Sequence, residues 1–329
     1  MKSSITGKEM KLVYEKRTWN FRGEPYEFIH TAWHCEDSGE QFTNEAQDTA
    51  GFVQVTNQYR AKYGIPYTDE IIAVRQRYGI SAAKMSLILG IGINQYRLYE
   101  QGEVPSVSNG RMIRSIMNPK VMMELVESSR NELSQTEYAK ITAKVKAVIT
   151  ESEAFKMEQY EIRRVFNVPR GMENGYAQTS LIRLKNVMLY LLEKCGEVWC
   201  TKMNKLLFYL DFLSYREYGM AITGLSYRAI DLGPVPDRWD KVYSEFSEVK
   251  QELRQTGDFV GSVLIATEKA DSSLFTEDEI KVLEEVCANF RDKTSREISR
   301  LSHEENAWID YHANHERIPF KEAFSLKAI

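Results

Sequence analysis

Short helical patterns separated by glycine fill residues 68–116, and they constrain the fold more than any other feature of this 329-residue chain. Apolar and aromatic side chains from Ile71 to Tyr78 recur on one helical face, and Gly79 is placed to end that helix. Ser81 is a good N-cap for a second helix, because a serine hydroxyl accepts a hydrogen bond from the first free amides. The segment therefore predicts helices of only two or three turns.

A glycine turn and a third short helix complete this pattern. Gly90-Ile91-Gly92 predicts a tight turn, since glycine adopts backbone angles that larger residues avoid. A helix is expected from Asn94 to Gln101, with Tyr96 and Tyr99 directed inward. Two short helices joined in this way are typical of proteins that present a recognition helix to the DNA major groove.

Charge favours nucleic-acid binding here over a generic helical bundle. Residues 67–120 carry seven Lys or Arg and four Asp or Glu, a net charge of +3, whereas the whole chain is at −4. The rest of the chain is therefore at −7, so a basic surface is concentrated in this segment.

The same segment resembles the Xre-type helix-turn-helix, and most closely that of MqsA-type antitoxins. The resemblance is carried by Val74-Arg-Gln-Arg-Tyr-Gly-Ile-Ser81, Leu89-Gly-Ile-Gly92, Tyr99-Glu-Gln-Gly-Glu103 and Pro105. It implies that Asn94 contacts an adenine edge. The position of the family's base-contacting arginine is occupied by Leu98 in this chain. The neighbouring Arg97 lies about 100° away from that position around the helix axis. The resemblance therefore implies an operator sequence that differs from the family's usual one.

We therefore expect operator DNA as one partner and a homodimer as the assembly, because such repressors bind two-fold operators. The predicted DNA-binding residues are Ser81, Lys84, Asn94, Gln95, Arg97 and Leu98.

Residues 10–34 alternate aromatic and polar side chains, which predicts a β-hairpin. The region resembles the zinc-binding half of MqsA-type antitoxins, but the ligand positions hold Ser3, Thr6, Cys35 and Ser38. One cysteine and three hydroxyls are a poor zinc site. We expect no metal and no cofactor, a hairpin held by aromatics such as Trp19, Phe21 and Trp33, and structural roles for His30 and His34.

A long helical stretch follows, beginning with the capping box Ser134-Gln-Thr-Glu137. Apolar residues at spacings of three and four run from position 138 to 166, interrupted by Ser152 and Gln159. Either a helix laid on the next domain or a dimer or connector helix fits this pattern. Residues 171–180 are predicted to be a linker.

Beyond the linker we expect an independent domain. Its predicted helices are 181–194, 201–217, 237–247 and 276–292, its strands lie at 225–232 and within 250–267, and Pro236 is expected in the first turn of a helix. The region resembles the Panacea domain of SocA-type proteins, through Lys205-Leu-Leu-Phe-Tyr-Leu-Asp-Phe212, Gly233-Pro-Val-Pro236 and Leu301-Ser-His-Glu304. The resemblance implies toxin binding, for which we predict Tyr215, Arg216, Tyr227 and Arg228 as contacts.

The fold class expected is mainly α with small β elements. The predicted domains are 1–66 (degenerate zinc-ribbon-like), 67–130 (helix-turn-helix), 131–178 (connector) and 179–329 (Panacea). No catalytic motif occurs, so no enzyme is expected. Scattered cysteines and the lack of a signal peptide or an apolar span favour a cytoplasmic protein without membrane contact.

Together these features predict an antitoxin that binds a cognate toxin directly and represses its own operon. Two alternatives stay open: an adaptor that delivers a toxin to a protease, and a prophage transcriptional regulator.

Overall fold

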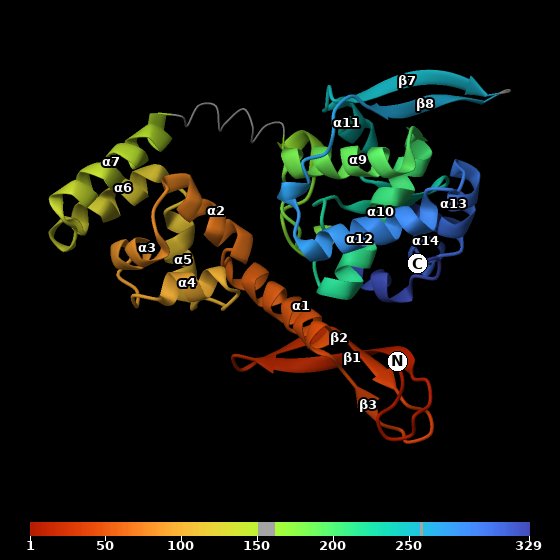
Figure 1. Ribbon diagram of the computed structural model, residues 1–329, viewed down its shortest axis with the longest axis horizontal. Coiled ribbons are helices and arrows are strands. Elements are labelled where there is room, and N and C mark those ends of the chain that lie inside the picture. Colours follow the sequence, from red (N-terminus) through yellow and green to blue (C-terminus); the bar gives the residue numbers. More distant parts are fainter. Residues whose placement is uncertain (151–161, 257–258) are drawn as a thin grey trace. The chain divides into compact units, whose positions relative to one another are not determined.

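The computed structural model describes residues 1–150, 162–256 and 259–329 (Figure 1). The chain forms two compact units, one of residues 1–55 with 162–329 and one of residues 56–161. We call them the α+β unit and the helical unit. The expected class, mainly α with small β elements, is confirmed. No helix in the described part of the chain combines the length and apolarity needed to cross a bilayer.

The predicted N-terminal hairpin is confirmed. Strands β1 (Lys11–Phe21) and β2 (Glu24–His34) pair antiparallel, and the short β3 (Gln41–Phe42) adds to β2. Both turn residues, Arg22 and Gly23, have positive φ, the geometry that matches strand twist in a two-residue turn. Trp19 packs against Phe28 at a ring-centroid distance of 5.8 Å. Helix α1 (Glu45–Tyr63) follows.

The helical unit begins within the C-terminal part of α1. Its described residues then form six α-helices, which are α2 (Thr68–Tyr78), α3 (Ala82–Ile88), α4 (Gln95–Glu100), α5 (Val107–Ser115), α6 (Pro119–Ser128) and α7 (Gln135–Thr150). The predicted capping box of α7 forms, since the Glu137 amide donates to Ser134 Oγ and the Ser134 amide donates to the Glu137 carboxylate. These helices share one apolar core.

Helix α7 packs inside its own unit, which neither interpretation of the long helical stretch anticipated. Ile141, Val145 and Val148 are buried and join the core formed by α2 and α6. The remaining positions of that pattern up to residue 161, including Ser152 and Gln159, lie outside the described residues.

In the α+β unit, α10 (Cys200–Tyr218) is central, and every residue from Lys202 to Tyr215 is buried. Around it lie α12 (Glu277–Phe290), α13 (Ser295–His303) and the 3₁₀ helix η5 (Phe320–Ser325), all in contact with α10 (Figure 1). Further α-helices of this unit are α9 (Leu181–Cys195), α11 (Trp239–Ser244) and α14 (Asn306–Ile309). A helix buried on all sides needs apolar residues around its whole circumference, which Lys205–Phe212 nearly supplies.

Two small sheets complete this unit. One has the order β4 (Val198–Trp199), β8 (Phe259–Ala266), β7 (Val249–Thr256), and the other pairs β5 (Tyr227–Ile230) with β6 (Gly233–Pro236). Pro236 therefore ends a strand, and its predicted place in the first turn of a helix is wrong. Helix α11 begins only at Trp239, because the Asp237 amide bonds to Ser226 O across the β5–β6 pair.

The predicted linker at 171–180 is also wrong. Asn174, Tyr176 and Ala177 are at most 1% exposed. The Asn174 side-chain amide donates to Ala177 O and Gly224 O, and the Arg170 guanidinium donates to Tyr176 O. Asn174 and Arg170 thus satisfy buried backbone carbonyls of a packed turn where a flexible joint was expected.

Candidate functional site

Two similar loops face each other at the start of the chain. The Gly7 amide donates to Ser3 O at 2.9 Å and the Gly39 amide donates to Cys35 O at 2.8 Å. Thr6 Oγ1 lies 3.3 Å from Cys35 Sγ. Hydrogen bonds from the Ser3, Ser38 and Thr6 hydroxyls lower the pKa of the Cys35 thiol to about 6.

This cluster does not fit zinc. Structural zinc sites use four thiolate or imidazole ligands, and here hydroxyl hydrogen bonds surround a single thiol. Among the described residues, no group of three or more His, Cys, Asp or Glu side chains could hold a metal. The His30 ring packs edge-on against Phe28, and burial lowers the pKa of His30. His30 therefore lies in the aromatic side of the hairpin.

The inner side of α4 is held by two tyrosines, as the sequence predicted. Tyr96 is fully buried, its amide donates to Ser86 Oγ at 3.1 Å, and its hydroxyl donates to Ile71 O at 2.8 Å. Tyr99 is 3% exposed, and its hydroxyl accepts a hydrogen bond from the Asn109 side chain at 2.8 Å. These contacts tie α4 to α2, α3 and α5, so the orientation of its outer face is set by the core.

The outer side of α4 displays Asn94, Arg97 and Leu98, which are all exposed. Asn94 is the N-cap residue, yet its side chain makes no capping hydrogen bond. Within the described residues, neither the Asn94 amide nor the Arg97 guanidinium has a hydrogen-bond or ion-pair partner. Both side chains are therefore free to meet a ligand.

The other three predicted DNA-binding residues already have partners. Ser81 Oγ caps α3 by accepting from the Lys84 amide. Lys84 Nζ lies 2.9 Å from Glu137 of α7, and this contact together with hydrogen bonds from Ser134 lowers the pKa of Glu137 to about 2. The Gln95 side chain donates to Glu103 at 2.9 Å. The sequence could not show these pairs, because Lys84 and Glu137 are far apart along the chain.

An apolar depression beside α4 was missed in the sequence. A pocket of about 250 Å³ is lined by Ala83, Lys84, Leu87, Ile91 and Ile93. Ile93 is 75% exposed, so a large apolar side chain stands in solvent directly before the exposed Asn94. The only sequence signal was an isoleucine placed within a polar turn.

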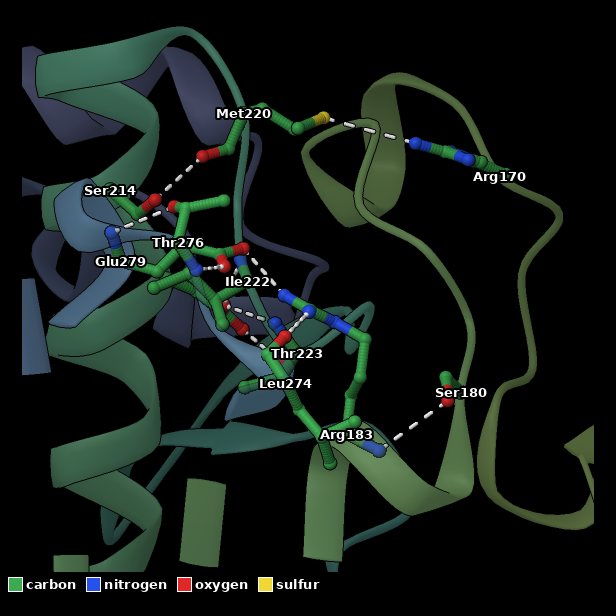
Figure 2. Close-up of polar contacts among 11 residues, drawn as sticks. Arg170, Ser180, Arg183, Ser214, Met220, Ile222, Thr223, Leu274, Thr276 and Glu279 are labelled. Atoms are coloured by element: carbon green, nitrogen blue, oxygen red, sulfur yellow. Dashed lines mark hydrogen bonds and ion pairs between the residues drawn. The ribbon is translucent and has the colours of Figure 1, made fainter. Parts of the chain in front are cut away.

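In the α+β unit, a buried carboxylate organises the segment after α10. Asp211 is 0% exposed and accepts hydrogen bonds from the Ile222 amide at 2.9 Å, the Thr223 amide at 2.8 Å, the Thr223 hydroxyl, and the Tyr227 hydroxyl at 2.6 Å. Burial raises the pKa of Asp211, and these donors oppose that shift. Figure 2 shows Ile222 and Thr223 in this segment, with the Ser214 hydroxyl donating to Met220 O.

The neighbouring polar contacts are structural as well. The Arg183 guanidinium of α9 donates to Leu274 O and forms an ion pair with Glu279 (Figure 2). Glu279 also closes a capping box with Thr276 at the start of α12. This set ties α9 to the start of α12.

The predicted toxin contacts Tyr215 and Tyr227 require a correction, because both belong to the core. Tyr227 is 0% exposed, and its hydroxyl donates to Asp211 at 2.6 Å with Leu207 O as a second acceptor within reach at 2.9 Å. Tyr215 is 8% exposed and packs against Phe320. In β5 the side chains alternate, so Tyr227 points inward and Arg228 outward.

The two predicted arginines are both engaged, and of the two the Arg228 side chain is the more exposed. Arg228 Nε donates to Asp237 at 2.6 Å, and its Nη1 donates to His315 O. The Arg216 side chain is 12% exposed and donates to Glu217 and to Ile329 O. Neither offers a free guanidinium, so these four positions form no common binding surface.

Lys205 is another buried ionisable group of α10. It is 1% exposed, and its Nζ donates to Leu232 O at 2.6 Å and Pro234 O at 3.0 Å, on either side of Gly233. Burial lowers the pKa of Lys205 to about 7. Gly233 has φ +98°, and a Cβ there would lie 2.7 Å from Lys205 Cε. The lysine and glycine together hold the turn between β5 and β6.

Comparison with known proteins identifies one region. Residues 203–309 match the family model described as "Antitoxin SocA-like, Panacea domain". No curated protein and no solved structure matches the chain significantly. The matched residues run from the first turns of α10 through α14, and they contain Lys205, Asp211, Tyr227 and Gly233. This portion of the α+β unit is thus similar to a domain of antitoxins.

Proposed function

We propose that this chain is an antitoxin that neutralises a cognate toxin by direct protein binding. The observation that carries the proposal is the match of residues 203–309 to the SocA-like antitoxin domain. The acidic and basic groups inside that region support a binding role over a catalytic one. Asp211, Lys205 and Glu305 are buried and hydrogen-bonded to groups of the fold itself.

Growth rescue tests this proposal. The protein encoded beside this chain's gene is expressed alone and together with the full chain, and we expect growth arrest in the first case and recovery in the second. Purified chain should also form a complex with that protein in gel filtration. Recovery without a complex, combined with a shortened toxin half-life that depends on a cellular protease, would favour the adaptor alternative.

We further propose that the helical unit binds operator DNA as a helix-turn-helix and represses the chain's own operon. The exposed Asn94 and Arg97 on α4, with no partner among the described residues, support this. So does the +3 charge of residues 67–120. Arg97 and Asn94 would contact base edges or phosphates, and the exposed Leu98 and Ile93 could meet thymine methyl groups. A homodimer would place two such helices on a two-fold operator.

Binding of the full chain to its own promoter tests the repressor proposal. We expect Asn94→Ala to weaken binding by about 1–3 kcal/mol, and Arg97→Ala to weaken it and reduce its salt dependence. Asn131→Ala is the matched control, because Asn131 is an exposed asparagine of the same unit outside α4. Equal binding of promoter and random DNA by the unmodified chain would contradict the proposal, and sedimentation of the complex reports the dimer.

A further inference from the structure

A pocket of about 680 Å³ opens on the α+β unit. Its apolar lining includes Val198 and Trp199 of β4 and Leu232 from the turn between β5 and β6. Leu232 is 64% exposed, although it is a large apolar side chain at the tip of a turn held by Lys205. Apolar side chains left in solvent beside a pocket are typical of surfaces that a protein partner covers.

Cations line the other side of this pocket. They are Lys202 of α10, Lys293 before α13, and Arg296 in the first turn of α13. The ammonium of Lys202 donates to Arg291 O at 2.8 Å, so it is fixed in place. The acidic lining residue, Glu197, is already paired with Arg254 at 2.6 Å.

Lys293 and Arg296 stand out because neither forms an ion pair or side-chain hydrogen bond within the part of the chain that the structure describes. Nearby arginines behave differently, since Arg300 is paired with Glu304 and Arg291 with Asp292. Ser295 Oγ, also in the lining, is buried without a hydrogen-bond partner. The pocket therefore offers two free cations and an unsatisfied hydroxyl beside an apolar wall.

We propose that this pocket is the surface through which the α+β unit binds its toxin, and that its occupant is an acidic segment of the toxin carrying at least one large apolar side chain. The inference rests on the proposed antitoxin function. Carboxylates of the segment pair with Lys293 and Arg296, and the apolar side chain packs on Trp199 and Leu232. Apolar anchors beside arginine are the usual energetic centre of protein interfaces.

Charge reversal in the full chain tests this. The probe is the protein encoded beside this chain's gene, and the variant is Lys293→Glu with Arg296→Glu. We expect its Kd to be about tenfold higher or more, with a weaker dependence on salt, because two attractive contacts become repulsive. Leu232→Ser should raise the Kd by a smaller factor while leaving the salt dependence unchanged.

Lys281→Glu with Arg300→Glu is the matched control. It makes the same change in net charge on α12 and α13, at exposed positions outside the pocket lining. We expect it to bind the toxin nearly as the unmodified chain does. Thermal unfolding of the pocket variants, and the binding of all variants to promoter DNA, should stay unchanged.

The outcomes separate the two proposals. If the unmodified chain binds the toxin and the pocket variant binds no more weakly than the control, this inference is wrong and the antitoxin proposal stands. If the unmodified chain does not bind the toxin at all, the antitoxin proposal fails and this inference fails with it. If the pocket variant loses promoter binding and keeps toxin binding, the cations serve nucleic acid and the inference is again overturned.

Discussion

Helices α4 and α10 both carry tyrosines and charged side chains, yet the two helices use them in opposite ways. On α4 the tyrosines face the core while Asn94 and Arg97 stand in solvent without partners among the described residues. On α10 two tyrosines, Tyr209 and Tyr215, are enclosed, and so are the ionisable Lys205 and Asp211. The polar side chains at α4 are thus candidate ligand contacts, whereas those of α10 stabilise the fold.

The difference follows from how much of each helix is covered. Helix α4 has six residues and packs on one side against α2 and α3. Helix α10 has nineteen residues and contacts α12, α13, β6 and η5. A polar group enclosed in this way must be hydrogen-bonded, because an unpaired buried polar group costs free energy.

The largest effect should come from Asp211→Ala. The change leaves the Ile222 and Thr223 amides and the Thr223 hydroxyl buried without their acceptor, and we expect a loss of about 3–5 kcal/mol in the free energy of unfolding. Chemical denaturation measures it, with Asp240→Ala as the exposed control. A loss below that of an ordinary surface substitution would show that α10 is not organised around this carboxylate.

Gly233→Ala should be the next in size. The residue combines positive φ with a Cβ contact of 2.7 Å to Lys205 Cε and 2.8 Å to Ser302 Oγ, so we expect a loss of about 2–4 kcal/mol. Gly102→Ala is the comparison, since Gly102 has φ +104° and nothing within 4 Å of the added Cβ. Gly102→Ala should lower the free energy of unfolding by about 1–2 kcal/mol, through backbone strain alone. Equal losses would argue against crowding at the β5–β6 turn.

Lys205 should give the folded state a pH dependence that Lys205→Met lacks. The pKa of Lys205 is about 7 in the folded state and about 10.4 in the unfolded state. Between these two pH values the Lys205 amine takes up a proton when the chain unfolds. The unmodified chain should therefore gain stability relative to the variant as pH rises through this window, by up to about 1.4 kcal/mol per pH unit. Below about pH 7 the difference should be constant. Parallel curves across the window would mean that Lys205 stays charged when buried.

The smallest effect is expected at Lys84. Since its ammonium is held by Glu137, Lys84→Ala should weaken promoter binding less than Arg97→Ala does. Glu137→Gln should release the ammonium and strengthen binding slightly at low salt. Titrations at two salt concentrations measure both effects. A larger loss from Lys84→Ala than from Arg97→Ala would reverse the proposed order of contacts.

Local patterns were enough to predict much of the fold. The period-two aromatics predicted the hairpin at 10–34, the capping box placed the start of α7, and helical spacing placed Tyr96 and Tyr99 in the core. Each of these depends on residues within a few positions of one another. Three- and four-residue spacings and caps act through neighbouring turns of the same helix, so they can be recognised without knowing the rest of the chain.

The sequence by itself determined where most helices and strands lie, that residues 67–120 are basic, and that one cysteine cannot make a zinc site. Only the tertiary structure decided which polar side chains are available. Tyr227 meets Asp211, Lys84 meets Glu137, and neither Lys293 nor Arg296 forms an ion pair with a described residue. Such pairings join residues that are distant in sequence, and their energies depend on burial and separation, which the order of residues does not contain.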